Sequence, residues 1–193
     1  MKRLLVILIL TFNFQTLAKA DDIRDFEIEG MSIGDSLLDY FSKDEIEKNI
    51  DENIHKDLDG KFKLTGFYGK SSEYDGLQLA FKANDKKYII YGINGGIFYS
   101  DMQKCEKKLK SISNELSNLF KNAEKSFDVK QIHPADKTGK SYAISDVFFL
   151  KTGSASVRCT NWSNEISLKY GWNDNLRVGI KAKEYNDWLP SAQ

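Results

Sequence analysis

Proline, cysteine and histidine are scarce in this chain of 193 residues, which contains two of each. So little proline, together with 24 aromatic residues, argues for a folded chain rather than a disordered one. A zinc site usually needs four cysteine or histidine ligands, so the chain has barely enough for one. Beyond residue 20, no apolar run approaches the roughly 20 residues of a membrane-spanning helix.

An excess of positive charge is also absent. The chain has 28 basic and 28 acidic side chains. Removal of a leader of 20 residues would also remove Lys2, Arg3 and Lys19. The remaining chain would have 25 basic and 28 acidic side chains, a small net negative charge. A protein that binds nucleic acid usually has spare cations for the phosphates. The composition therefore argues against nucleic acid as a partner.

The first 20 residues have the order of a secretory signal peptide. A basic head is followed by an unbroken apolar run over 4–10, and then by Ala18-Lys19-Ala20, which has the small-x-small form of a cleavage site. We expect cleavage before Asp21. Residues 21–193 would then form one domain in the periplasm or the medium.

The alternative for this leader is a membrane anchor. The apolar run is shorter than a spanning helix, and Asn13 and Gln15 interrupt its second half. No cysteine lies at or just after the cleavage site, so lipid attachment is not expected. The sequence therefore predicts no membrane span once the leader is gone.

Cys105 and Cys159 are the only cysteines in the chain. In an oxidising compartment the simplest interpretation is a single disulfide bond, which would link residues 54 positions apart. A redox-active or metal-binding pair is the alternative. Redox motifs usually place the cysteines two residues apart, and only His55 and His133 could complete a zinc site. We therefore predict a structural disulfide.

Hydrophobic periodicity predicts an α+β fold. We expect a mostly antiparallel sheet of about 5–6 strands, with a long helix (about 101–124) and two short N-terminal helices packed on one side of it. Ser42 and Glu45 form a capping box for the second short helix, and Ser100 and Gln103 form one for the long helix. The expected strands span 62–67, 77–83, 88–99, 142–150, 155–162 and 176–182.

Four further features of the chain lead to local predictions. Residues 21–29 indicate a leading strand or an extended arm. Gly95-Gly96 predicts a bulge or kink in the third strand. Residues 128–141 indicate an ordered polar loop. Trp188 and Leu189 are expected to pack the C-terminal segment against the rest of the domain.

Residues 30–99 and 101–183 are loosely similar in element order, which suggests two related halves. The first half, with Gly30-Met31-Ser32 leading into two helices and three strands, resembles β-lactamase-inhibitor-like repeats and the small outer-membrane assembly lipoproteins. The resemblance implies a helix pair followed by a three-stranded sheet. It also implies a non-catalytic, protein-binding role in the cell envelope.

The segment 136–141 reads Asp-Lys-Thr-Gly-Lys-Ser. Its first four residues match the phosphorylation motif of cation-pumping ATPases, and its last three resemble the end of a P-loop. Lys140 replaces the threonine of the first motif, and Pro134 replaces the first glycine of the second. We expect a polar turn that leads into a strand.

Other residues are of types found in catalytic or metal sites, but the sequence does not supply the partner residues that such sites require. His133 lies near Asp136, but no nucleophile motif accompanies it, so we expect an exposed loop histidine, and His55 on a helix surface. The acidic stretch 51–60 resembles a calcium loop, yet Gly66 stands where the loop requires glutamate. The sequence therefore assigns no catalytic, cofactor-binding or metal-binding residue.

Asn161-Trp162-Ser163 satisfies the glycosylation rule, which we interpret as coincidence in a bacterial-type export protein. Trp162, Trp172 and Tyr170 lie close together in the sequence. Core packing is the favoured role for them, and a groove that stacks sugar rings is the alternative.

These patterns favour binding over catalysis. We expect an exported, soluble, non-catalytic binding module of the bacterial envelope, with an envelope protein or a small ligand as its partner. The alternative is a hydrolase that uses carboxylates to act on glycans.

The leader leads to a direct prediction. Protein recovered from the envelope or the medium of an expressing bacterium should begin at Asp21, because a signal peptidase cuts after the small residue at position 20. N-terminal sequencing measures this. Recovery of the chain with Met1 intact would contradict it.

Overall fold

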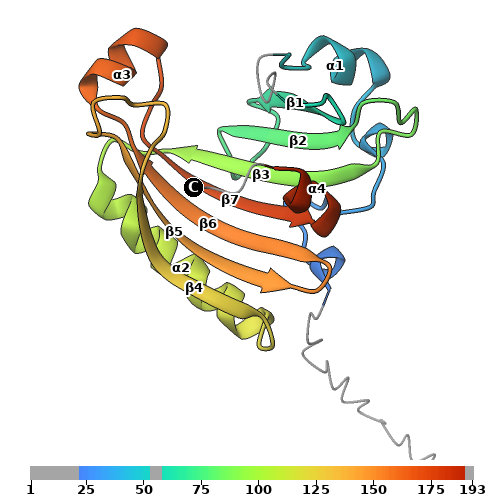
Figure 1. The fold of residues 1–193 in the computed structure, drawn as a ribbon. Coiled ribbons are helices and arrows are strands. Elements are labelled where there is room, and N and C mark those ends of the chain that lie inside the picture. The colour runs from blue at the N-terminus through green and yellow to red at the C-terminus, as the bar shows by residue number, and fades with distance from the viewer. Residues whose placement is uncertain (1–21, 53–57, 190–193) are drawn as a thin grey trace, which may run out of the picture.

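A computed structural model describes residues 22–52 and 58–189. The predictions for the signal peptide, for cleavage before Asp21 and for His55 lie outside these residues. Seven strands form one antiparallel sheet in the order β1-β2-β3-β7-β6-β5-β4 (Figure 1). They are β1 Phe62–Tyr68, β2 Gly76–Lys82, β3 Ile90–Phe98, β4 Glu124–Ile132, β5 Tyr142–Leu150, β6 Gly153–Asn161 and β7 Asn175–Ala182.

Helices of very different lengths accompany the sheet. They are α1 Lys43–Lys48, α2 Met102–Leu119, α3 Asn164–Tyr170 and α4 Lys183–Trp188, with 3-10 turns η1 Ile23–Asp25 and η2 Leu37–Asp39. The α+β class and the antiparallel sheet are confirmed. Within the described residues, no helix is both long enough and apolar enough to cross a membrane.

One face of the sheet, here called the covered face, carries the main hydrophobic core. Helix α2 packs on β5, β6 and β7. Its apolar stripe buries Cys105, Leu109 and Leu116, as the spacing of three and four predicts. The N-terminal segment joins the same core, where Leu37 and Ile46 are fully buried.

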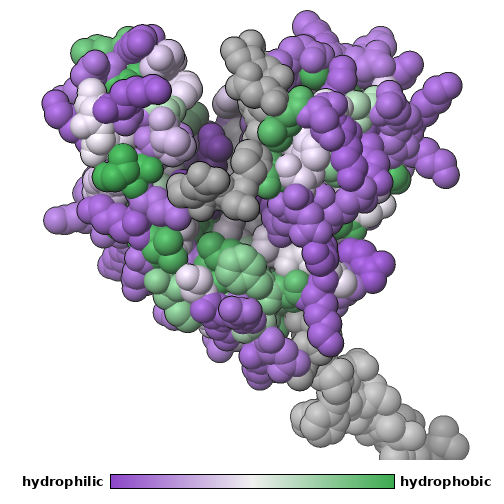
Figure 2. Space-filling model, in the orientation of Figure 1, coloured by the Kyte–Doolittle hydropathy of each residue, from purple (hydrophilic) through white to green (hydrophobic). Residues whose placement is uncertain are grey.

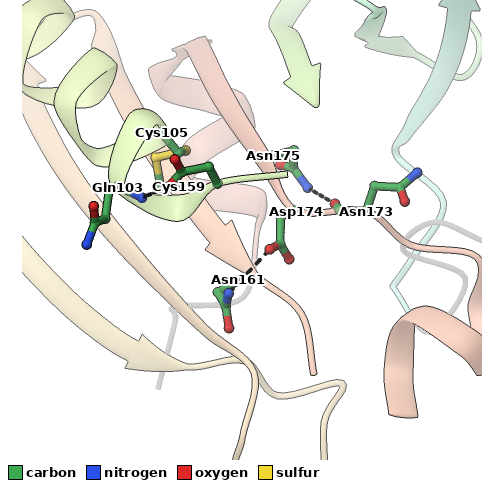
Figure 3. The surroundings of a disulfide bond; sticks show 8 residues. Gln103, Cys105, Cys159, Asn161, Asn173, Asp174 and Asn175 are labelled. Atoms are coloured by element: carbon green, nitrogen blue, oxygen red, sulfur yellow. Dashed lines mark hydrogen bonds between the residues drawn. A yellow bond between two sulfur atoms is a disulfide. The ribbon is translucent and has the colours of Figure 1, made fainter. Parts of the chain in front are cut away.

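The disulfide joins α2 to the sheet. Cys105 and Cys159 are bonded, with their Cα atoms 6.1 Å apart, and neither is exposed (Figure 3). Val157 and Cys159 share the covered face because side chains of a strand alternate between its two sides. The predicted pairing is therefore present, and it holds the first turn of the long helix against β6.

The long helix differs from its prediction at both ends. Its N-cap is Asp101, whose side chain accepts a hydrogen bond from the Gln103 N–H, instead of the expected Ser100. Aspartate caps as well as serine does, one residue further along. At the other end the chain leaves the helix at Phe120, whose ring still lies in the core. The Phe120 side chain extends the apolar stripe of the helix although the residue itself is no longer helical, so the apolar spacing overestimates the length of the helix.

Strand β4 is the strand that the sequence did not predict. It lies at one edge of the sheet, pairs only with β5, and occupies residues assigned to the helix end and the polar loop. Its register shifts between Ser126 and Val129, where Asp128 has φ +54°. This bulge breaks the two-residue period from which a strand is recognised. The sheet therefore has seven strands, not 5–6.

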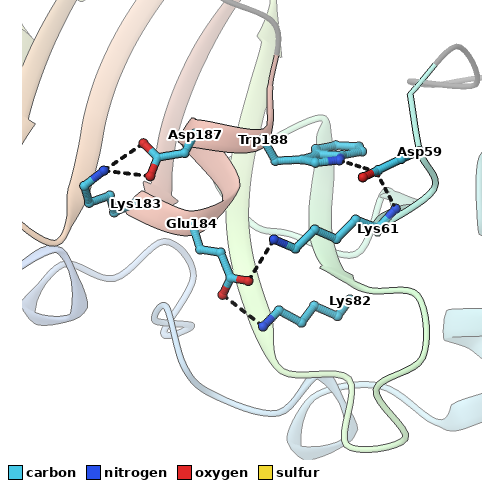
Figure 4. A network of polar contacts seen from close by, with 7 residues as sticks. All are labelled: Asp59, Lys61, Lys82, Lys183, Glu184, Asp187 and Trp188. Carbon is cyan, nitrogen blue, oxygen red and sulfur yellow. Dashed lines mark hydrogen bonds and ion pairs between the residues drawn. The ribbon is translucent and has the colours of Figure 1, made fainter.

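The expectation that all helices lie on one side is wrong. Tyr185 of α4 packs on Phe62, Leu64 and Ala80, which belong to the opposite face of the sheet, here called the open face. Glu184 bridges Lys61 and Lys82, and the Trp188 indole donates to Asp59 (Figure 4). The predicted docking of Trp188 and Leu189 is thus present, on the face away from α2.

Two other local predictions also need correction. Gly95-Gly96 carries no bulge, because β3 keeps its register with β2 and β7 through both residues. The irregularity lies instead between Ala80 and Phe81. Residues 22–31 form a 3-10 turn and the small Ile28–Met31 bridge in place of a leading strand.

The disulfide should contribute strongly to stability. Replacing both Cys105 and Cys159 by alanine frees a loop of 54 residues in the unfolded chain, which lowers the free energy of unfolding by about 4 kcal/mol. Urea denaturation of the oxidised protein and of the double variant measures this. A loss below about 1 kcal/mol would contradict the clamp described here.

Candidate functional site

The pairing of β6 with β7 places two arginines side by side on the open face. Arg158 and Arg177 are direct cross-strand partners in the register. Each lies between covered-face residues of its own strand, so both side chains belong to the other side of the sheet. Directly opposite residues have Cβ atoms about 5 Å apart, a distance at which like charges repel.

No acidic side chain of the described residues forms an ion pair with either arginine. The buried Nε–H of Arg158 also lacks a hydrogen-bond partner there. Burial lowers the pKa of Arg158, and the charge of Arg177 lowers it further. Burial likewise lowers the pKa of Lys181, with Arg158 adding to the effect. Arg158, Arg177 and Lys181 thus share this face without an acidic partner among residues 22–52 and 58–189.

Two hollows flank the arginine pair. The larger has a volume of about 820 Å³ and is lined by residues from β4 to β7 and α4, including Arg158 and Lys181. The smaller, of about 80 Å³, lies over β1, β2, β3 and β7 and includes Arg177. We call the two hollows and the pair between them the groove. Figure 2 shows the molecule hollowed between the α3 end and the β1–β2 end.

The lining of the groove mixes apolar and hydrogen-bonding side chains. Its apolar residues include Leu77, Phe98, Val129, Val147, Phe149, Leu150 and Leu189. Its amides and serine hydroxyls are those of Gln78, Asn94, Gln131, Asn175, Asn186, Ser126, Ser145, Ser154 and Ser156. Asp187 is the acidic residue of the described lining, and the Lys183 ammonium lies 2.6 Å from its carboxylate. The groove therefore presents hydrogen-bonding groups around an unneutralised positive centre.

Two glycines shape the open face. Gly96 lies opposite Arg177 and lines the smaller hollow. A Cβ built on Gly96 would meet only the Gly76 carbonyl oxygen, at 3.8 Å, so a side chain here would project into the hollow and reduce its depth. A Cβ on Gly92 would come within 2.7 Å of the Tyr185 ring. Glycine there lets α4 seat against the sheet.

Four aromatic rings gather beyond the ends of β4 and β6. The ring centroids of His133 and Trp162 are 4.3 Å apart, those of Trp162 and Trp172 are 4.6 Å apart, and those of Trp172 and Tyr170 are 5.0 Å apart. Trp172 and Tyr170 are 39% and 48% exposed, and none of the four rings belongs to a buried cluster. The expectation of core packing is therefore wrong.

His133 connects this aromatic cluster to the groove. Its ring packs on Trp162 and is half-buried, so the predicted solvent-exposed loop histidine is wrong. Burial lowers the pKa of His133, and the charges of Arg158 and Arg177 lower it further, while Asp136 opposes them. The imidazole therefore lies within the electrostatic reach of the arginine pair.

The segment 136–141 is a turn that its own aspartate organises. The Asp136 carboxylate accepts hydrogen bonds from Ser141, Thr138 and Ser163. The bonds from Ser141 and Thr138 hold its pKa well below the usual range. Asp136 is buried and thereby ties the turn to the start of α3. Its oxygens are occupied, as the predicted structural role of this segment requires.

The remaining sequence candidates are not brought together. The acidic stretch lies partly outside the described residues. Within 22–52 and 58–189, no three His, Cys, Asp or Glu side chains cluster as metal ligands would. Asn161 donates from its side chain to Asp174 (Figure 3). The Asp174 carboxylate also accepts a hydrogen bond from the Trp162 N–H.

No protein-family model, no curated protein and no solved structure matches the chain. The function must therefore be inferred from the groove itself.

The sequence contains a signal for the arginine pair that went unused. Beyond the leader the chain has three arginines among many lysines, at positions 24, 158 and 177. Two of them stand in the middle of predicted strands, each between apolar neighbours of the opposite face. Because arginine is favoured where anions are recognised, this placement could have indicated a site.

The lowered pKa of His133 leads to a prediction on pH. Below the ordinary histidine pKa of about 6.5 the unfolded chain binds a proton that the folded chain resists, so acidification costs stability. Between about pH 7 and about pH 5, wild type should lose more thermal stability than His133→Gln. Melting curves at several pH values measure the difference. A constant difference across that range would contradict the role of burial and of the two arginines.

Proposed function

We propose that this protein is an exported, non-catalytic binding protein, and that its groove holds a ligand whose anionic group lies on Arg158 and Arg177. The observation that carries the proposal is the arginine pair, for which the described part of the chain provides no acidic partner. Arginine binds carboxylate, sulfate and phosphate groups through two parallel N–H bonds. Two guanidinium groups side by side suit a ligand with one or more such groups.

The energetics of the free protein support a ligand. Like charges directly opposite each other in a sheet destabilise it, and an unpaired buried donor costs about 1–3 kcal/mol. Replacement of either arginine by a neutral polar residue would relieve this cost. A costly arrangement with no structural benefit is typical of a functional site.

Export is the second part of the proposal. The leader supports it, and the Cys105–Cys159 disulfide fits an oxidising compartment such as the periplasm or the medium. The envelope role implied by the resemblance of residues 30–99 agrees with this location. The ligand would then be a molecule that a cell meets outside its cytoplasm.

The hydrolase alternative has weaker support. A glycosidase needs two carboxyl groups about 5–9.5 Å apart across the bound sugar. The described lining of the groove offers Asp187, which is paired with Lys183. Near the aromatic cluster, Asp136 and Asp174 both accept structural hydrogen bonds. We therefore favour binding without catalysis.

Arginine side-chain NMR tests the proposal. Inorganic phosphate and sulfate, titrated separately, should shift the Nε–Hε signals of Arg158 and Arg177, because both guanidinium groups are free to bind an anion. Arg158→Gln and Arg177→Gln should each weaken this binding about tenfold or more, the effect of losing a charge-assisted hydrogen bond. Each variant should also remain folded and be no less stable than wild type.

Arg24 is the internal control. Its guanidinium is already bound to Asp22, with Nη2 2.6 Å from Oδ2, so its signal should not move at the same anion concentration. Equal shifts of all three arginines would indicate general screening by salt. That result, or no shift at Arg158 and Arg177, would contradict the proposal.

A further inference from the structure

The position of the aromatic cluster along β6 leads to a more specific identification of the ligand. Arg158 and Thr160 share the open face of β6, and Trp162 follows the last residue of this strand, Asn161. Four residues of extended strand span about 13 Å. The aromatic cluster, which includes Trp162, therefore lies roughly that far along the sheet from the arginine pair, beyond the residues that line the groove.

On the basis of the proposed anion-binding function, we infer that the ligand is an acidic oligosaccharide. Its carboxylate would lie on Arg158 and Arg177, and a sugar ring about 13 Å away would stack on the exposed aromatic surface around Trp172. Two or three pyranose rings cover this span. The structure thus favours the sugar-stacking role that the sequence left as the alternative for these residues.

The amides and hydroxyls among the residues that line the groove support a sugar over simpler anions. Sugar hydroxyls both donate and accept hydrogen bonds. Amide side chains such as those of Gln78, Asn94 and Asn175 offer both functions, and the serines Ser145 and Ser156 do as well. A simple inorganic anion would leave these groups without partners. Their position on both sides of the arginine pair fits a polyhydroxylated chain.

Single-stranded nucleic acid is the competing class, since bases also stack on aromatic rings. Two observations disfavour it. Such proteins line the path of the backbone with many cations. The described lining of this groove has four, of which Lys183 is paired with Asp187, and the chain as a whole has equal numbers of basic and acidic residues. The four rings also pack on one another, with angles of 57° and 54° at Trp162, and so leave no slots between them for successive bases.

Isothermal titration calorimetry on the mature, disulfide-bonded protein tests the inference. The acidic probes are trigalacturonate, trimannuronate and a hyaluronan tetrasaccharide. The comparison probes are maltotriose, which lacks charge, tripolyphosphate, which lacks rings, and the trinucleotide dT3. At least one uronate probe should bind roughly tenfold tighter than both maltotriose and tripolyphosphate, because it alone contacts both the arginine pair and the aromatic cluster.

Two variants separate the ring contact from the charge contact. Trp172→Ala should weaken the binding of that uronate roughly five- to tenfold and leave tripolyphosphate unchanged, since Trp172 belongs to the aromatic cluster. Leu168→Ala is the matched control: this side chain is 88% exposed on the adjacent α3 and should change neither affinity.

The outcomes distinguish the inference from the proposed function. If tripolyphosphate binds as well as every uronate and Trp172→Ala has no effect, the groove is an anion site and the saccharide inference is wrong. Tighter binding of dT3 than of any uronate would also overturn it, in favour of nucleic acid. If no anionic probe binds at all, the proposed function fails together with the inference.

Discussion

The alternation of side chains along β6 is the constraint on which the rest of the structure depends. Cys159 faces helix α2 and is bonded to Cys105, so the strand cannot rotate or slip by one residue without breaking the core. The neighbouring Arg158 must then face the other way. Through the register with β7, the same constraint places Arg177 directly beside it. One buried contact thus determines the position of the charged pair.

The covered face of the sheet contains the hydrophobic core, whereas the open face contains the candidate site. The covered face buries apolar residues from α2, the N-terminal segment and every central strand, and supplies most of the stability. In the part of the chain that the structure describes, α4 packs on the open face against β1, β2, β3, β6 and β7, and salt bridges and aromatic contacts hold it in place. The remaining surface carries cations, amides and rings. A sheet whose covered face is well packed can hold the side chains of its open face in fixed positions, which a binding site requires.

Much of the fold could be predicted from the sequence, because its periodic signals are local. The stripe of α2, the alternation of β5, β6 and β7 and the Ser42–Glu45 capping box all appear as expected. The edge strand β4 could not be predicted, since its bulge at 126–129 breaks the period and Phe127 is 48% exposed. The short α3 gave no such signal. The side of the sheet chosen by α4 depends on contacts with residues more than 100 positions earlier.

The candidate site was less predictable than the fold. Its parts come from all seven strands, from α3 and α4, and from the loops that carry His133, Trp162 and Trp172. The order in which strands pair is a long-range property that no single strand encodes. Trp162, Trp172 and Tyr170 were noticed by their closeness in sequence. Arg158 and Arg177 were not, because each alone is an ordinary outward-facing residue of a strand. Only the register turns them into a pair.

A double-mutant cycle on the free energy of unfolding tests the central claim most directly. Arg158→Gln, Arg177→Gln and the double variant are unfolded in urea at low salt without ligand. Uncompensated repulsion predicts that each single variant is at least as stable as wild type, with an unfavourable coupling of about 0.2–1 kcal/mol between the arginines. If each single variant instead loses more than about 1 kcal/mol, the arginines already have a stabilising partner, and the groove is not a vacant anion site.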